Sequence, residues 1–319
     1  MDLPGLYRFN TQAVRDLAWV IGSPPLLQNS VQLNSIDFIE NDFFLHQFLI
    51  FKNQLNRLDK NPSALNCFLE KNNTRLIGKY FERLVEFWLL HREDVKLIDS
   101  NIQINSGNKT LGEFDFIYKD LTSGQFIHLE VAGKFYLAQH NSSGWSNFIG
   151  PNGIDNLQSK LNKIQNSQIP LAENKTAKRV FKKLGITNNL ISKVILKGYL
   201  FYNLKYFQNN NYAMPGSSEP SHLKGWWLRE SDIELLDNFS AGKWKIIERK
   251  NWVSRIYNCK KEKIFDTKKL IFELKKYFSA NRYPLLIAGL YQGNNNCLFE
   301  KSRGFIVSNS WPNDERKKV

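Results

Sequence analysis

Residues 111–134, LGEFDFIYKDLTSGQFIHLEVAGK, decide how we expect this chain to fold. Two runs rich in aromatic and β-branched residues flank a short polar turn centred on Ser123 and Gly124. Side chains alternate between the two faces of a strand, so each run presents one set of residues to each side. One face of the first run carries Glu113, Asp115 and Ile117, the other carries Phe114, Phe116 and Tyr118, and one face of the second run carries His128, Glu130, Ala132 and Lys134.

This predicted hairpin places Asp115, Glu130 and Lys134 on one side of a sheet. Two acids and a lysine are costly to bury in an apolar setting without partners. One interpretation is a divalent-metal site, because carboxylate oxygens suit magnesium or manganese and a lysine can orient water or stabilise developing charge. The other interpretation is two exposed strand faces that carry an ion pair. The hairpin alone leaves both open.

The segments around the hairpin predict further elements of an α/β fold. Upstream, residues 74–92 have apolar residues at helical spacing, with Glu82 and Glu86 one turn apart beside the apolar stripe. Downstream, residues 151–165 predict a second helix and residues 193–204 another strand. The order is therefore helix, strands, helix and strand, with acids on the first helix and on both hairpin strands.

This arrangement resembles the PD-(D/E)XK, or restriction-endonuclease-like, nuclease superfamily. The resemblance implies that Asp115 and Glu130 hold Mg²⁺ or Mn²⁺ and that an acid of the first helix, Glu82 before Glu86, completes the site. It also implies a lysine that assists the attacking water. The superfamily has that lysine two residues after the Glu, where this chain has Ala132, and Lys134 follows two residues later on the same strand face.

Other stretches resemble a bacterial domain family of unknown function that is grouped with these nucleases. They are VRDLAWVIGSPPLL near the start, GKYFERL, LEVAGKFYL, WSNFIGPNGID and the closing RGFIVSNSWP. This resemblance spans nearly the whole chain, whereas the nuclease resemblance covers about residues 75–205. It implies no particular substrate.

We therefore expect an α/β protein with a restriction-endonuclease-like core. The predicted regions are an N-terminal helical arm (1–74), the nuclease-like core (75–205) and a C-terminal α+β extension packed on it (206–319). In the helical arm, Asp42 is the expected N-cap of a long helix. Arg15 and Asp16 are expected on a solvated helix face, with a position at the active cleft as the alternative. The tryptophans of the C-terminal region are expected in the core.

Composition narrows the classes of partner. Among 319 residues there are 44 Lys and Arg against 30 Asp and Glu, a net charge of +14, and such an excess favours polyanions. The longest apolar runs are too short or too charged to span a bilayer, and no signal-peptide pattern opens the chain. Cys67, Cys259 and Cys297 form neither a zinc motif nor a disulfide framework, which favours a cytoplasmic location.

Basic residues after the hairpin are candidates for nucleic-acid contacts. Lys160 opens the predicted helix that, by the nuclease resemblance, lies beside the active site. The stretch 172–185 carries Lys178, Arg179 and Lys182 at helical spacing. Solvated helix surfaces are the alternative interpretation for both groups.

Three functions follow as expectations. The first is a magnesium-dependent nuclease, with DNA as the favoured substrate. The second is a nuclease-fold protein that binds nucleic acid or a protein partner with weak or no cleavage, which the displaced lysine favours. The third is an interaction module whose acids form a surface network.

Overall fold

The computed structural model describes residues 6, 8–33, 35–71, 76–186, 190–239, 241–257, 263–293 and 297–313. Four helices come first along the chain: α1 (Gln12–Gly22), α2 (Asn41–Lys60), α3 (Ser63–Glu70) and α4 (Ile77–Leu90). The later helices are α5 (Leu157–Lys163), α6 (Lys175–Lys183), α7 (Leu204–Phe207) and α8 (Thr267–Ala280). No described helix is both long and apolar enough to cross a membrane.

One mixed sheet runs through the described chain in the order β1-β2-β3-β5-β6-β9-β8-β7, with the short β4 paired to β3. Its strands are β1 (Val95–Ser106), β2 (Lys109–Asp120), β3 (Phe126–Ala138), β4 (Phe148–Ile149), β5 (Leu190–Asn203), β6 (Leu223–Arg229), β7 (Lys243–Ile247), β8 (Leu285–Gln292) and β9 (Leu298–Val307). Strands β3, β5, β6 and β9 are parallel, and antiparallel pairs complete both ends. The mixed α/β class is thus confirmed.

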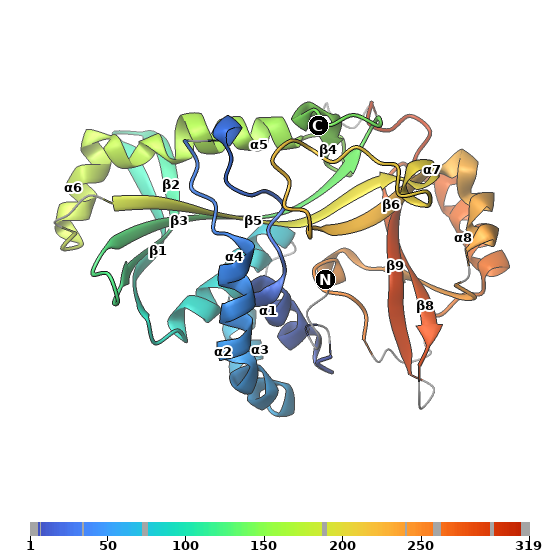
Figure 1. Ribbon diagram of the computed structural model, residues 1–319, viewed down its shortest axis with the longest axis horizontal. Coiled ribbons are helices and arrows are strands. Elements are labelled where there is room, and N and C mark those ends of the chain that lie inside the picture. The colour runs from blue at the N-terminus through green and yellow to red at the C-terminus, as the bar shows by residue number, and fades with distance from the viewer. Residues whose placement is uncertain are drawn as a thin grey trace.

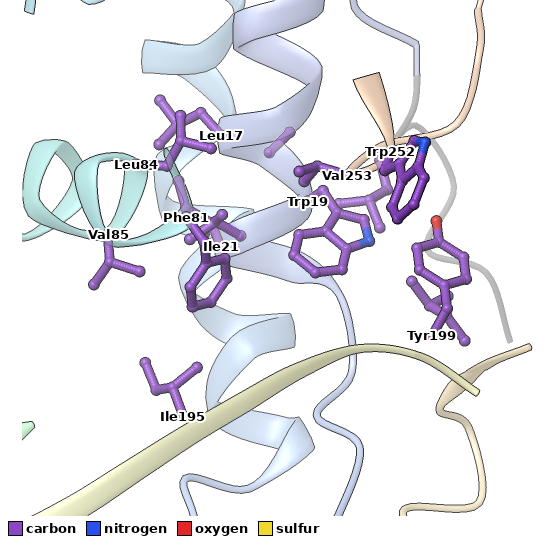
Figure 2. Close-up of a cluster of buried hydrophobic side chains, with 14 of the residues drawn as sticks. Leu17, Trp19, Ile21, Phe81, Leu84, Val85, Ile195, Tyr199, Trp252 and Val253 are labelled. Carbon is purple, nitrogen blue, oxygen red and sulfur yellow. The ribbon is translucent and has the colours of Figure 1, made fainter. Parts of the chain in front are cut away.

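Helices cover both faces of the sheet. α1–α4 lie on one face and α5 and α6 on the other (Figure 1). On the first face, α1 and α4 cross β5 through Trp19, Phe81 and Tyr199 (Figure 2), and the Trp19 and Tyr199 rings stack at 6.1 Å. This core continues into the C-terminal strands through Leu286 and Phe305. The cores under α5, α6 and α8 fill the other face.

Several sequence predictions are confirmed. The turn between β2 and β3 has Gly124 at φ +74, and Asp120 accepts hydrogen bonds from the backbone of Thr122 and Ser123. β8 and β9 pair antiparallel. The C-terminal tryptophans are buried, and these are Trp226, Trp227, Trp244 and Trp252.

Other predictions are wrong. Residues 95–106 form β1, an edge strand that the sequence analysis did not predict. Asp42 lies in the first turn of α2, whose N-cap is Glu40. Arg15 and Asp16 are buried, because Arg15 donates to the carbonyl of Phe9 and Asp16 accepts from the Tyr80 hydroxyl.

The alternation predicted for β2 also fails at one position. Phe116 packs on the α4 side of the sheet, whereas Phe114 packs against Phe181 of α6 and the His128 ring. On the neighbouring strand Asn101 has a positive φ of 52°. Both β2 and the neighbouring β1 are thus irregular at the level of Asp115.

Candidate functional site

The two strands of the hairpin separate at Asp115. Their pairing runs from Lys119↔Phe126 to Phe116↔Leu129 and stops there, one step before Asp115 and Glu130 would pair. Beyond this point β2 stays with β1, and β3 stays with β5. Side chains of both sheet-covering layers therefore meet at the split.

A cavity of about 680 Å³ lies at this split. β2 and β3 form its floor, and the start of α4, the end of α5 and the 249–252 segment contribute walls. Its charged and amide-bearing lining residues are Lys79, Glu82, Glu113, Asp115, Glu130, Lys134, Asn152, Asp155, Lys160, Lys163, Gln168 and Arg249. The cavity volume is within the usual range for small-molecule sites.

Asp115 takes the place of a strand-pairing group. Its Oδ2 accepts a hydrogen bond of 2.9 Å from the backbone N–H of Val131 on β3. Burial and then the neighbouring Glu130 carboxylate raise the pKa of Asp115 to about 8, against the opposing effect of the Val131 hydrogen bond. A carboxyl group in a cavity whose pKa is raised this far is a candidate functional group.

Glu130 is 1% exposed, and only one of its two carboxylate oxygens has hydrogen-bond partners among the described residues. Its Oε1 accepts hydrogen bonds from Lys160 Nζ at 3.0 Å and from the Gln168 amide. Its Oε2 is buried and has no hydrogen-bond partner among the described residues. Buried carboxylate oxygens are normally paired, so an unpaired one beside a cavity indicates room for a ligand.

Glu82 reaches the cavity from the opposite layer. A Cβ on Gly133 would lie 3.0 Å from Phe81, so this glycine lets α4 pack closely on β3. Lys79 donates to Glu82 at 2.7 Å and to Glu113 at 3.3 Å. Burial raises the pKa of Glu82, and Lys79 partly offsets that rise.

Lys134 lines the cavity but contacts a different acid from the one expected. Its Nζ donates to Asp155 Oδ2 at 2.6 Å, in the loop that precedes α5. Its backbone is closely packed, since a Cβ on Gly198 of β5 would lie 1.6 Å from the Lys134 carbonyl oxygen. The lysine that contacts Glu130 is Lys160, a candidate for nucleic-acid contacts in the sequence.

The remaining candidates lie elsewhere. Glu86 accepts from Arg83 and Ser100 and is not among the described residues that line the cavity. Lys178, Arg179 and Lys182 are exposed on α6, outside the described cavity lining, and Lys178 pairs with Glu173 at 2.6 Å.

Sequence reasoning did not assign site roles to Lys79, Glu113, Asp155, Gln168 and Arg249. The spacing of Lys79 three residues before Glu82 was a usable signal, because such residues are neighbours on a helix. Asp155 and Arg249 gave none, because their approach to the cavity depends on tertiary structure.

The site offers carboxylates without a ready metal cage. Among the described residues, no three His, Cys, Asp or Glu side chains gather closely enough to hold a metal ion on their own. Magnesium is commonly held by one or two carboxylates together with waters and substrate phosphates. The unpaired Oε2 of Glu130 beside Asp115 fits that kind of binding.

Comparison with known proteins identifies the family but no individual relative. No curated protein and no solved structure gives a significant match to the chain. A family model described as "Domain of unknown function (DUF1853)" matches residues 15–307, which is most of the chain. The chain therefore belongs to the DUF1853 family.

Proposed function

We propose that the cavity is the active centre of a metal-dependent nuclease with a restriction-endonuclease-like core. The observation that carries this proposal is the pair of acids at the strand split. Asp115 and Glu130 line one cavity, and the buried Oε2 of Glu130 has no partner among the described residues. The element order, from α4 through β1–β3 and α5 to β5, agrees with the resemblance seen in the sequence.

In this proposal Asp115 and Glu130 hold Mg²⁺ or Mn²⁺, and Glu82 adds negative charge from α4. A bound divalent ion polarises a phosphodiester and lowers the pKa of a coordinated water. Asp115 would have to lose its proton to hold the metal, because metal ligands must be deprotonated. Lys79 keeps Glu82 and Glu113 next to each other at the cavity rim.

We assign the role of the lysine that assists the attacking water to Lys160 in preference to Lys134. The Lys160 ammonium lies 3.0 Å from Glu130 Oε1, and its side chain is 11% exposed, so it acts in a partly desolvated setting. An ammonium there is placed to orient water and stabilise charge that develops on a phosphate. Lys134 is occupied by Asp155 and serves this role only if that ion pair opens.

The substrate class proposed is nucleic acid, with DNA favoured by the resemblance. The net charge of +14 supports a polyanionic substrate.

A protein that binds nucleic acid without cutting it is the second candidate. The observation that favours it is the engagement of both lysines: Lys134 pairs with Asp155, and Lys160 compensates Glu130. In that case the acids and lysines of the cavity stabilise each other and no water is activated.

Metal titration and cleavage together separate the two candidates. We expect isothermal titration to detect one manganese site that Asp115→Asn removes, and magnesium-dependent cleavage of single-stranded, duplex or nicked DNA or of RNA. Glu82→Gln should weaken both, whereas Glu86→Gln, one turn along the same helix and outside the cavity lining, is the matched control. Metal binding without cleavage of any of these substrates would favour the binder, and absence of metal binding would refute the nuclease.

A further inference from the structure

The size of the cavity restricts what can enter it. About 680 Å³ is a volume that a few nucleotides of one strand can fill. The acids lie on the cavity floor, at the split between β2 and β3. A single strand can therefore reach them without a partner strand having to enter the cavity.

The contacts along β3 show how α5 is oriented over the cavity. Lys134 contacts Asp155 and, four residues earlier on the strand, Glu130 contacts Lys160, so α5 runs opposite to β3. Lys163, three residues after Lys160 at the end of α5, also lines the cavity. On the α1–α4 face of β3, Phe135 packs against Trp252, and Trp252 and Arg249 both line the cavity. Glu130 and Phe135 are five residues apart, about 17 Å of strand.

Arg249 is an exposed cation on a rigid support. Its guanidinium lies 5.9 Å from the Trp252 ring and makes no hydrogen bond or ion pair with another described residue. Trp252 is fixed by an edge contact with Phe305 at 4.9 Å and by a hydrogen bond to the carbonyl of Ile247. Figure 2 shows Trp252 beside Tyr199 in the core.

Lys163, at the end of α5, is a second exposed cation of the cavity lining. It lines the cavity, is exposed, and has no ion pair with a described residue. The other cavity lysines are engaged, with Lys79, Lys134 and Lys160 each bound to an acid. Arg249 and Lys163 are thus the cavity cations that remain available to a ligand within the described chain.

We propose that a single strand of nucleic acid lies lengthwise in the cavity, with Arg249 and Lys163 each bound to a backbone phosphate on opposite sides of Asp115 and Glu130. This inference rests on the proposed function and names its substrate class. It also gives the C-terminal region a direct part in substrate binding.

Binding without metal tests this strand path separately from catalysis. The probe is a fluorescent single-stranded hexanucleotide, measured in EDTA over a salt series with the full-length protein. Arg249→Ala and Lys163→Ala should each weaken binding roughly tenfold, as expected when one charged hydrogen-bond partner is removed. Each should also reduce the salt slope by about 0.7, the value for one phosphate contact on a single strand.

Lys250→Ala is the matched control, because Lys250 is exposed on the same turn, pairs with Glu248 at 3.0 Å and is not among the described cavity residues. Arg249→Lys should restore part of the slope, and thermal unfolding checks that each variant folds. Unchanged slopes in both alanine variants, duplex binding as tight as single-strand binding, or no binding of the wild type would overturn the strand path. Cleavage with manganese is scored separately, so a binder that follows this path but does not cut refutes only the nuclease.

Discussion

Two buried acid–base pairs in this protein differ in how completely they are satisfied. On β9, Arg303 donates to both carboxylate oxygens of Glu300 and to the carbonyls of Trp252 and Ser254. The backbone N–H of Ile256 donates a further hydrogen bond to Glu300. On β3, Lys160 and Gln168 share one oxygen of Glu130, and the other oxygen has no described partner.

The difference separates a structural pair from a candidate ligand. The Glu300–Arg303 pair fixes residues 252–256 against the sheet, and a β-bulge between Glu300 and Ser302 helps both side chains reach the same segment. The Glu130–Lys160 pair borders a cavity that Asp115 also lines, and Glu130 raises the pKa of Asp115 whereas Lys160 opposes that rise. Incomplete pairing at a cavity costs stability, which is typical of groups kept for function.

The largest expected effect is on stability. Glu300→Gln leaves the Arg303 charge buried with a neutral partner, so we expect a loss of about 3–5 kcal/mol in the free energy of unfolding. Glu130→Gln removes repulsion with Asp115 and leaves Lys160 near the cavity, so we expect a change below about 1 kcal/mol. Urea unfolding of both variants measures this, and equal losses would end the distinction between the two pairs.

The next effect concerns the two cavity lysines. If the nuclease proposal holds, Lys160→Met should lower cleavage by about 10²–10³-fold, the scale of losing one preorganised donor, with manganese still bound. Lys134→Met should lower it less than about tenfold, because Lys134 is paired with Asp155. A larger loss of cleavage in Lys134→Met than in Lys160→Met would assign the role of the lysine that assists the attacking water to Lys134, as the spacing in the sequence predicts.

Local patterns predicted most of the helices and the central strands. The run from Phe126 to Phe135 and the turn at Gly124 carry strong strand and turn signals, and they form as expected. The β1 strand was missed because its apolar alternation is interrupted: Val95 and Leu97 are out of step with Ile102 and Ile104, and the pairing with β2 shifts between Leu97 and Asp99.

The candidate site was predicted in part for a physical reason. Asp115, Glu130 and Lys134 are close in the sequence, so strand periodicity sufficed to place them in one region. The pairing of Lys160 with Glu130 and of Lys134 with Asp155 depends on how α5 crosses β3. No local pattern encodes that crossing, and the same holds for Arg249, which is 119 positions after Glu130.

The pH dependence of stability offers a further test of the same pair of acids. The pKa of Asp115 is raised from 3.8 to about 8, so the native state retains a proton that the unfolded state releases between these values. In EDTA, stability should therefore fall as pH rises through this window, by at most about 1.4 kcal/mol per pH unit. Asp115→Asn should remove this component, and parallel pH profiles for the two proteins would contradict the assignment.

The smallest effect concerns the basic face of α6, which follows the Lys163 end of the cavity along the chain. Lys178, Arg179 and Lys182 are exposed there, and Lys178 already pairs with Glu173. Because they lie outside the described cavity lining, replacing all three by Ala should leave hexanucleotide binding unchanged. A strand long enough to leave the cavity past Lys163 can reach α6, so on such a strand the salt slope should fall by about 0.7 for each phosphate that the triple variant no longer binds. Comparison of the two lengths measures whether α6 extends the strand path, and an unchanged slope on the long strand would assign its basic residues to solvation alone.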